Sequence, residues 1–150
     1  MQLTEHFSFE EFTTTEMRGM VDTNTAQAQN YLPALRVTAQ LLEQVRAVLG
    51  GQPLVVDSGF RCPELNQLVG GSPFSQHVIG EAVDFRAPEW TDEQKMDALV
   101  SIQNSGIRFH QLLIENGCLH IAQPHPNDVQ GEVAYWNAGV KQILRAGVSA

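Results

Sequence analysis

The longest periodic pattern of apolar residues lies in the second quarter of the chain. Apolar residues recur there at steps of three and four positions, which is one face of a helix with about 3.6 residues per turn. The pattern begins after Pro33 and ends at Gly50-Gly51, and glycine is typical just beyond the C-terminus of a helix. We therefore predict a packing helix, without a catalytic role, whose buried face holds Leu35, Ala39, Leu42, Val45 and Leu49.

Two capping boxes mark further helix starts, at Ser8-Phe9-Glu10-Glu11 and at Thr91-Asp92-Glu93-Gln94. In each box, the first and fourth residues satisfy each other's free backbone amides. The first box predicts a short helix, and the second predicts a helix that ends near Ser105-Gly106. Pro63 favours one more helix, running to about Val69, because proline is common at the first helical position.

Alternation of apolar and polar residues predicts a strand over 81–86. Val83 and Phe85 share one face of this strand, and the residues that alternate with them, including Asp84, share the other. Asp84 is therefore expected on the side opposite the apolar core, where it looks into a cleft.

The dipeptide Asn116-Gly117 is the strongest hairpin signal in the chain, and strand-like segments precede and follow it. A two-residue turn there pairs Glu115 with Cys118 and places His120 two residues further along the return strand. Residues two apart on a strand share a face, so Glu115 and His120 should project from the same side as diagonal neighbours.

Strands are also predicted at 53–57 and 132–137. The polar segment 13–30 is interpreted as a surface loop, and the residues after 137 as a weakly patterned tail. Strands before, between and after helices indicate an α+β fold with a small antiparallel sheet flanked by helices. At 150 residues, the chain fits one domain that spans 1–150.

Composition narrows the classes of function. The chain is 43% hydrophobic and 17% charged, as in ordinary globular proteins, and no apolar run approaches the roughly 18–20 residues of a membrane span. A net charge of -8 with nine scattered basic residues argues against nucleic acid as a partner. Cys62 and Cys118 form no CxxC pair and are expected to be reduced thiols. The N-terminus has no secretory pattern, so we expect synthesis in the cytoplasm.

The stretch Ser75-Gln76-His77-Val78-Ile79-Gly80-Glu81-Ala82-Val83-Asp84 carries the densest candidate chemistry. His77 and Asp84 share one loop-and-strand unit, and His120 lies in another strand-like context. Two nitrogens and one oxygen, with a fourth position left to water, are the ligand set of a catalytic zinc site rather than a structural one. We therefore predict that these three residues bind zinc.

This SxHxxGxAxD pattern follows Ser58-Gly59-Phe60-Arg61 and precedes the strand Cys118-Leu119-His120-Ile121-Ala122. Together these motifs resemble the zinc D-alanyl-D-alanine carboxypeptidases and related peptidoglycan peptidases, especially the small single-domain members common in phages and prophages. The resemblance runs from about Phe7 to about Ala122. It implies a Hedgehog/DD-peptidase-like architecture and a zinc ion bound by His77, Asp84 and His120.

For each remaining candidate residue of the site, a purely structural role is the alternative to a functional one. Better-known branches of the family place the catalytic glutamate three residues before the last histidine, where this chain has Gly117. The hairpin register instead offers Glu115 as the general base, the alternative being a solvated strand-end carboxylate. Arg61 matches an arginine that in relatives stabilises the substrate carbonyl or binds a carboxylate, the alternative being a surface ion pair. Ser75 contacts substrate or only caps its loop.

The other histidines, His6, His110 and His125, lack a matching partner in the sequence pattern. His125 lies between prolines shortly after the predicted ligand strand and could line the cleft. Cys118 shares the expected face of His120, and we interpret it as a small buried hydrophobic residue.

These observations predict a zinc metallopeptidase that hydrolyses peptide bonds in peptidoglycan stem peptides, as a D-Ala-D-Ala carboxypeptidase or an endolysin-type endopeptidase. Zinc would activate the carbonyl and a water, Glu115 would take the proton, and Arg61 would assist the oxyanion. The alternative is a non-catalytic virion or cell-wall-binding protein that retains the peptidase fold. We expect a monomer whose partner is peptidoglycan or its fragments, and which reaches the wall after phage lysis or as a virion component.

Overall fold

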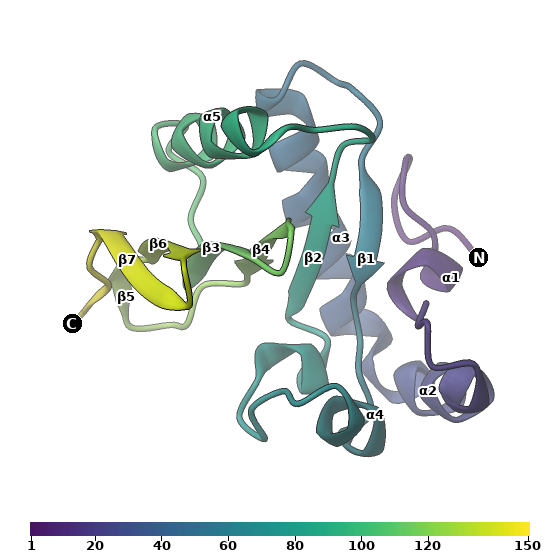
Figure 1. Cartoon of the computed structure of the whole chain (residues 1–150). Helices are drawn as coiled ribbons and strands as arrows, with labels where there is room; N and C mark the ends of the chain where they lie inside the picture. The colour runs from purple at the N-terminus through teal and green to yellow at the C-terminus, as the bar shows by residue number, and fades with distance from the viewer.

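The alternating segments of the sequence pair into a six-stranded sheet. The computed structural model describes residues 1–150 and orders the strands β1-β2-β4-β3-β6-β7 (Figure 1). All neighbours are antiparallel except β3 and β6, which are parallel. The strands are β1 (Val55–Ser58), β2 (Ala82–Arg86), β3 (Gln111–Glu115), β4 (Cys118–Ala122), β6 (Glu132–Asn137) and β7 (Val140–Arg145), and a separate two-stranded sheet pairs β5 (Asp128–Gln130) with β8 (Val148–Ser149).

Two longer helices pack beside this sheet. In Figure 1, α3 (Leu32–Val48) runs behind β1 and β2, and α5 (Asp92–Gln103) lies at the top of the view. Helix α5 contacts α3, β3 and β4. The shorter helices are α1 (Phe9–Phe12), α2 (Val21–Ala28) and α4 (Pro63–Leu68), and the 3-10 helices are η1 (Arg18–Met20), η2 (Gln29–Tyr31) and η3 (Gln76–Ile79). The predicted α+β class, with a mostly antiparallel sheet and flanking helices, is confirmed.

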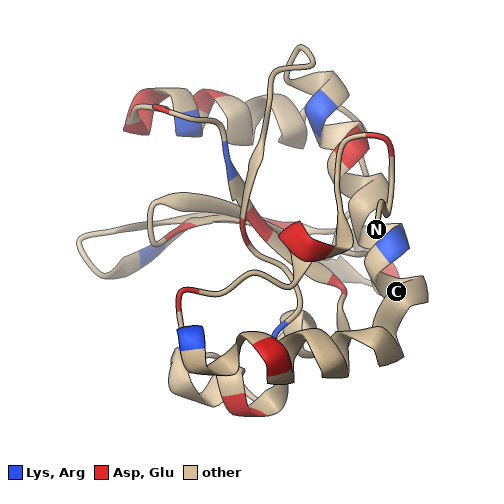
Figure 2. Ribbon diagram, turned by 90° about the vertical axis from the view of Figure 1, so that its right-hand side faces the viewer, with Lys and Arg blue, Asp and Glu red and all other residues tan.

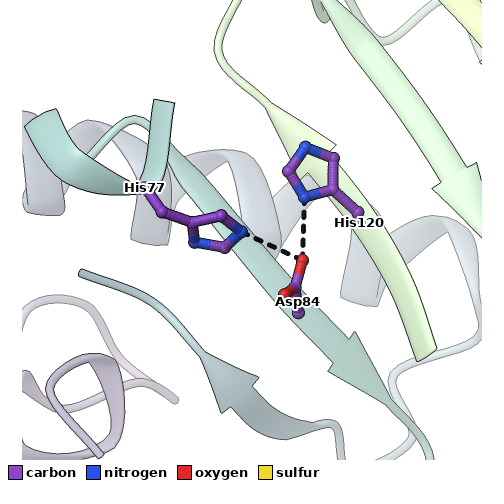
Figure 3. A group of neighbouring side chains, drawn as sticks. All are labelled: His77, Asp84 and His120. Atoms are coloured by element: carbon purple, nitrogen blue, oxygen red, sulfur yellow. Dashed lines mark hydrogen bonds and ion pairs between the residues drawn. The ribbon is translucent and has the colours of Figure 1, made fainter. Parts of the chain in front are cut away.

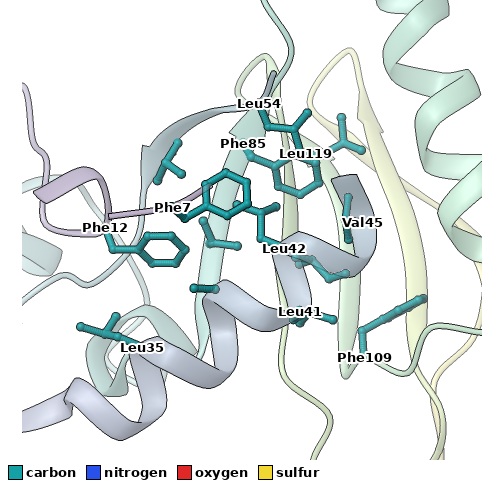
Figure 4. Packing of buried hydrophobic residues seen from close by; sticks show 14 of the residues in the cluster. Phe7, Phe12, Leu35, Leu41, Leu42, Val45, Leu54, Phe85, Phe109 and Leu119 are labelled. Atoms are coloured by element: carbon teal, nitrogen blue, oxygen red, sulfur yellow. The ribbon is translucent and has the colours of Figure 1, made fainter. Parts of the chain in front are cut away.

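The core lies between α3 and the sheet. Leu42 and Val45 of α3 are fully buried, as are Phe85 of β2 and Leu119 of β4 (Figure 4). Burying each such side chain contributes about 2 kcal/mol to folding. The alternation predicted for β2 holds, because Val83 and Phe85 join the core while Asp84 lines a cleft on the other face.

Several local predictions are confirmed. Both capping boxes form, with the Ser8 and Thr91 hydroxyls each accepting a hydrogen bond from the backbone amide three residues on. The hairpin pairs Glu115 with Cys118, as the two-residue turn requires. Its turn residues Asn116 and Gly117 have φ of 53° and 80°, the left-handed region that Asn-Gly favours.

The interpretation of 13–30 as a surface loop is wrong. This segment holds η1, α2 and η2. It lacks a recognisable apolar stripe because α2 buries only Asn24 and Ala28. A helix whose main anchor is a buried amide leaves no hydrophobic periodicity to read.

The residues after 137 were also misinterpreted as a weakly patterned tail. They form β7, which continues the sheet next to β6, and the short β8. The side chains of β7 are exposed or half-buried, so no buried face imposes the alternation that marks a strand. Ala138 and Gly139, with φ of 51° and 78°, make the turn between β6 and β7.

Charged residues are distributed over several elements rather than gathered on one. Figure 2 shows lysines and arginines on separate helices, strands and connections, interspersed with acidic residues. Among the helices, none combines the length and the apolar character needed to cross a membrane.

Candidate functional site

The three predicted metal ligands meet in the structure. Asp84 on β2 lies directly opposite His120 on β4, and His77 reaches the pair from η3 (Figure 3). Asp84 Oδ1 is 3.2 Å from His77 Nε2 and 2.8 Å from His120 Nδ1. All three potential ligand atoms lie within 4.8 Å of one another. Asp84 and His120 are 36 residues apart in sequence, and the antiparallel pairing of β2 with β4 places them opposite each other.

His77 is held from outside this cluster. Its Nδ1 lies 2.6 Å from the carbonyl oxygen of Gly59, and its own carbonyl accepts a hydrogen bond from Arg61 N at 3.1 Å. A carbonyl only accepts, so Nδ1 carries the hydrogen, and in the neutral ring Nε2 then presents its lone pair towards Asp84. Gly59 has no room for a side chain, because a Cβ there would lie 2.5 Å from the backbone oxygen of Phe12. The Ser-Gly-Phe-Arg motif therefore positions the histidine motif.

Two small residues shape the loop that carries His77. The Ser75 hydroxyl accepts a hydrogen bond from His77 N at 3.2 Å, so Ser75 caps the loop, which is one of its two predicted roles. Ser75 also lines the cleft. Gly80 ends η3 with φ of 75°, and its carbonyl accepts a hydrogen bond from Thr38 Oγ1 at 2.7 Å. Glycine at this motif position allows the left-handed turn into β2.

Burial and neighbouring groups set the charge of the cluster. His77 is only 1% exposed, and this burial lowers its pKa, which favours the neutral imidazole that metals bind. Burial alone would raise the pKa of Asp84, but the adjacent imidazoles of His77 and His120 lower it more, so the pKa lies below its ordinary value. The Asp84 carboxylate is therefore ionised at pH 7, and burial disfavours the protonated form of His77.

The cluster forms part of a cleft of about 490 Å³. One wall is the loop from Val69 to His77, where Phe74 is 93% exposed. Strand β3 contributes Leu113 and Glu115, and Trp136 of β6 lies on the same lining. A cleft of this size and mixed polarity is suited to a small molecule or a short peptide.

Arg61 lines the cleft and does not form the surface ion pair considered from the sequence. Its Nε is buried without a hydrogen-bond partner. Burial lowers the pKa of Arg61, and the carboxylates of Asp84 and Glu115 oppose that shift. A half-buried cation with an unused donor is able to receive an anionic or oxyanionic group.

Glu115 lies on the cleft side of the hairpin, as the register predicted. The position three residues before His120 is Gly117, whose φ of 80° strains any residue with a Cβ. A glutamate at that position would therefore strain this turn. Cys118 is buried beside Glu115, and burial, together with the charge of Asp84, raises the pKa of its thiol to about 12. Cys62 and Cys118 are both free thiols.

The structure gives His6, His110 and His125 partners that the sequence pattern does not reveal. His6 Nδ1 lies 2.8 Å from Glu43 Oε1. His110 and His125 lie near Asp128 in a second cluster, and both histidines line the cleft, as was considered for His125. Sequence reasoning missed this cluster because it unites a residue before β3 with a turn before β5, and no spacing rule links them.

A further supporting residue was missed inside α2. The fully buried Asn24 amide donates to Thr13 O at 3.0 Å and to Phe60 O at 3.1 Å, and its Oδ1 accepts from Cys62 N at 2.8 Å. These bonds fix the backbone on both sides of Arg61. A single buried asparagine produces no sequence pattern that could reveal it.

Two imidazoles and a carboxylate converge in a cleft beside an arginine and a glutamate, an arrangement typical of metallohydrolase sites. Comparison with known families makes this specific. The model of the family described as Peptidase M15 matches residues 5–122, and the chain belongs to this family.

A relative of known name supports the same placement. The chain is 39% identical over 69 residues to the zinc D-Ala-D-Ala carboxypeptidase of Streptomyces albus G. The alignment covers 46% of this chain and 25% of the relative. The chain therefore matches about a quarter of the length of that curated relative.

Proposed function

We propose that this protein is a zinc-dependent peptidase that hydrolyses peptide bonds in peptidoglycan stem peptides. The observation that carries the proposal is the convergence of His77, Asp84 and His120 in a cleft that Arg61 and Glu115 also line. Membership of the M15 family supports peptide hydrolysis, and the name of the Streptomyces relative supports D-Ala-D-Ala peptides as the first substrate to test.

The residues present fit a zinc ion. His77 Nε2 and Asp84 Oδ1 face each other at 3.2 Å, and an imidazole nitrogen and a carboxylate oxygen are both common zinc ligands. His120 adds a second nitrogen donor, which completes an open three-ligand set. Zinc bound there would supply Lewis-acid activation of the scissile carbonyl and of the attacking water.

The remaining steps belong to side chains of this protein. The Glu115 carboxylate takes the proton of the attacking water and returns it to the leaving amine. The Arg61 guanidinium, with its buried and unpaired Nε, stabilises negative charge on the carbonyl oxygen or holds a substrate carboxylate. Ser75 holds the loop of His77 and is placed to contact substrate from the cleft wall.

The proposal is tested by incubating the purified protein with peptidoglycan fragments, including stem peptides that end in D-Ala-D-Ala, and following the products by mass spectrometry. We expect cleavage that a zinc chelator abolishes and added zinc restores. Circular dichroism should show that the metal-free protein keeps its fold, because the core is formed without the metal ligands.

Zinc bound at His77, Asp84 and His120 without turnover on any stem peptide would overturn the proposal. That result would favour the alternative, a non-catalytic cell-wall-binding protein of the same fold. A protein that cleaves equally well with and without chelator would instead remove zinc from the mechanism.

A further inference from the structure

A second cluster of potential metal-binding side chains includes two histidines, His110 and His125, that line the same cleft. His110, His125 and Asp128 have potential ligand atoms within 4.8 Å of one another. His110 Nδ1 lies 2.9 Å from Asp128 Oδ2, and His125 N donates to the same oxygen at 2.7 Å. The rings of His110 and His125 are stacked, with centroids 3.6 Å apart and planes 15° apart.

The backbone holds two of these residues firmly. His110 N donates to Ala122 O at 2.9 Å, and His110 O accepts from Glu132 N at 3.0 Å, so the residue is fixed on both sides. Asp128 N donates to His125 O at 3.0 Å, which closes the turn that carries both residues. The Asp128 side chain is only 7% exposed. His110 and Asp128 are thus fixed by the fold, whereas His125 is exposed.

The donor types restrict which cation could bind. Two imidazole nitrogens and one carboxylate oxygen suit zinc, nickel or copper, whereas calcium and magnesium prefer sets made of oxygen. A metal lies in the plane of each imidazole that binds it, so two rings stacked face to face cannot share one ion as they stand. His125 must turn its ring, which is exposed, and this rotation breaks its stack with His110.

We propose that His110, His125 and Asp128 form a second binding site for a divalent transition-metal ion, separate from the cluster of His77, Asp84 and His120. The site binds more weakly than the first, because binding breaks the ring stack and replaces the bonds that Asp128 now accepts. The inference does not depend on peptidase activity, since it rests on this cluster alone.

The first test counts metal ions by isothermal titration with zinc, starting from metal-free protein. We expect two equivalents for the parent, the second weaker, and loss of that second equivalent alone in His125→Ala and in His110→Ala. The matched control is His6→Ala, which removes an exposed histidine that is also paired with a carboxylate and should keep both equivalents. A parent that binds only one zinc, or a His125→Ala protein that still binds two, overturns the proposal.

A second measurement identifies the ligands directly. The first site is filled with one equivalent of zinc, copper is then added, and electron paramagnetic resonance counts the coordinated imidazole nitrogens. We expect two imidazoles in the parent and one in His125→Ala. A copper signal with no imidazole coordination, or one unchanged by His125→Ala, would show that the ion lies elsewhere. His125 is exposed, so its replacement leaves the fold intact for this comparison.

Discussion

The two clusters in the cleft contain the same donor types, two histidines and one aspartate, but they are supported differently. In the first, the rings of His77 and His120 are tilted by 60° with centroids 5.1 Å apart. In the second, the rings of His110 and His125 are nearly parallel at 3.6 Å. Tilted rings can direct their nitrogens to one point, whereas stacked rings cannot. In the second cluster, His125 must therefore turn its ring before His110 and His125 can bind one ion.

The origin of this difference lies in what holds each imidazole. His77 is oriented by the carbonyl of Gly59, a group outside the cluster, so the carboxylate of Asp84 remains available to an ion. In the second cluster Asp128 is itself the support, because it accepts from both His110 Nδ1 and the His125 backbone amide. An aspartate that organises a turn is only partly free to bind a metal. We expect substitutions to have larger effects around the first cluster than around the second.

The largest effect should come from Glu115→Gln. Glutamine keeps the shape of the side chain but accepts no proton, so turnover on peptidoglycan fragments should fall by about 10² to 10⁴, the usual scale for loss of a general base. Zinc content and the unfolding transition should stay at parent values. The matched control is Glu81→Gln, a glutamate that adjoins the same motif but does not line the cleft. A Glu115→Gln protein that works at the parent rate would assign the base to another group.

The next largest effect should come from replacing Asn24, whose hydrogen bonds hold the backbone on both sides of Arg61. Asn24→Ala leaves Thr13 O, Phe60 O and Cys62 N without their buried partner, and each such loss costs about 1 kcal/mol or more. We expect the free energy of unfolding, measured in urea, to fall by about 3 kcal/mol. The control is Asn30→Ala, an exposed asparagine whose loss should stay within about 0.5 kcal/mol. If the two variants were equally stable, Asn24 would not support the backbone around Arg61.

The sequence predicted the elements whose signals are local or periodic. Helix α3 has a continuous apolar face, and the capping boxes and the Asn-Gly turn depend on four residues or fewer, so all were found. The hairpin turn then fixed the register that puts Glu115 on the cleft side. The convergence of His77, Asp84 and His120 followed from a motif and its resemblance, because no local rule brings β2 next to β4.

The parts that were missed depend on contacts between distant residues of little periodicity. Helix α2 is anchored by the buried amide of Asn24, and β7 exposes most of its side chains, so neither displays an apolar stripe. The partners of His110 and His125 appear only when the turn before β5 folds back next to β3. Such contacts are set by the packing of the whole sheet, which the alternation within one strand does not encode.

The smallest effect is expected for Asp128→Asn. This substitution tests how much the hydrogen bonds of Asp128 support the second cluster. The neutral side chain weakens the bonds with His110 Nδ1 and His125 N, and the free energy of unfolding should fall by about 1 kcal/mol at pH 7, measured in urea with a chelator present. Burial raises the pKa of Asp128, but the bonds from His125 and His110 lower it more, to below its ordinary value of 3.8.

A carboxylate with a lowered folded-state pKa stabilises the fold fully above its unfolded pKa and loses that contribution as the pH falls through the folded value. The difference between the parent and Asp128→Asn should therefore shrink below about pH 4. Asp97→Asn, at an exposed position of α5, is the control and should show no such trend. A loss of about 3 kcal/mol or more at pH 7, as large as that expected for Asn24→Ala, would mean that the second cluster is supported as strongly as the first.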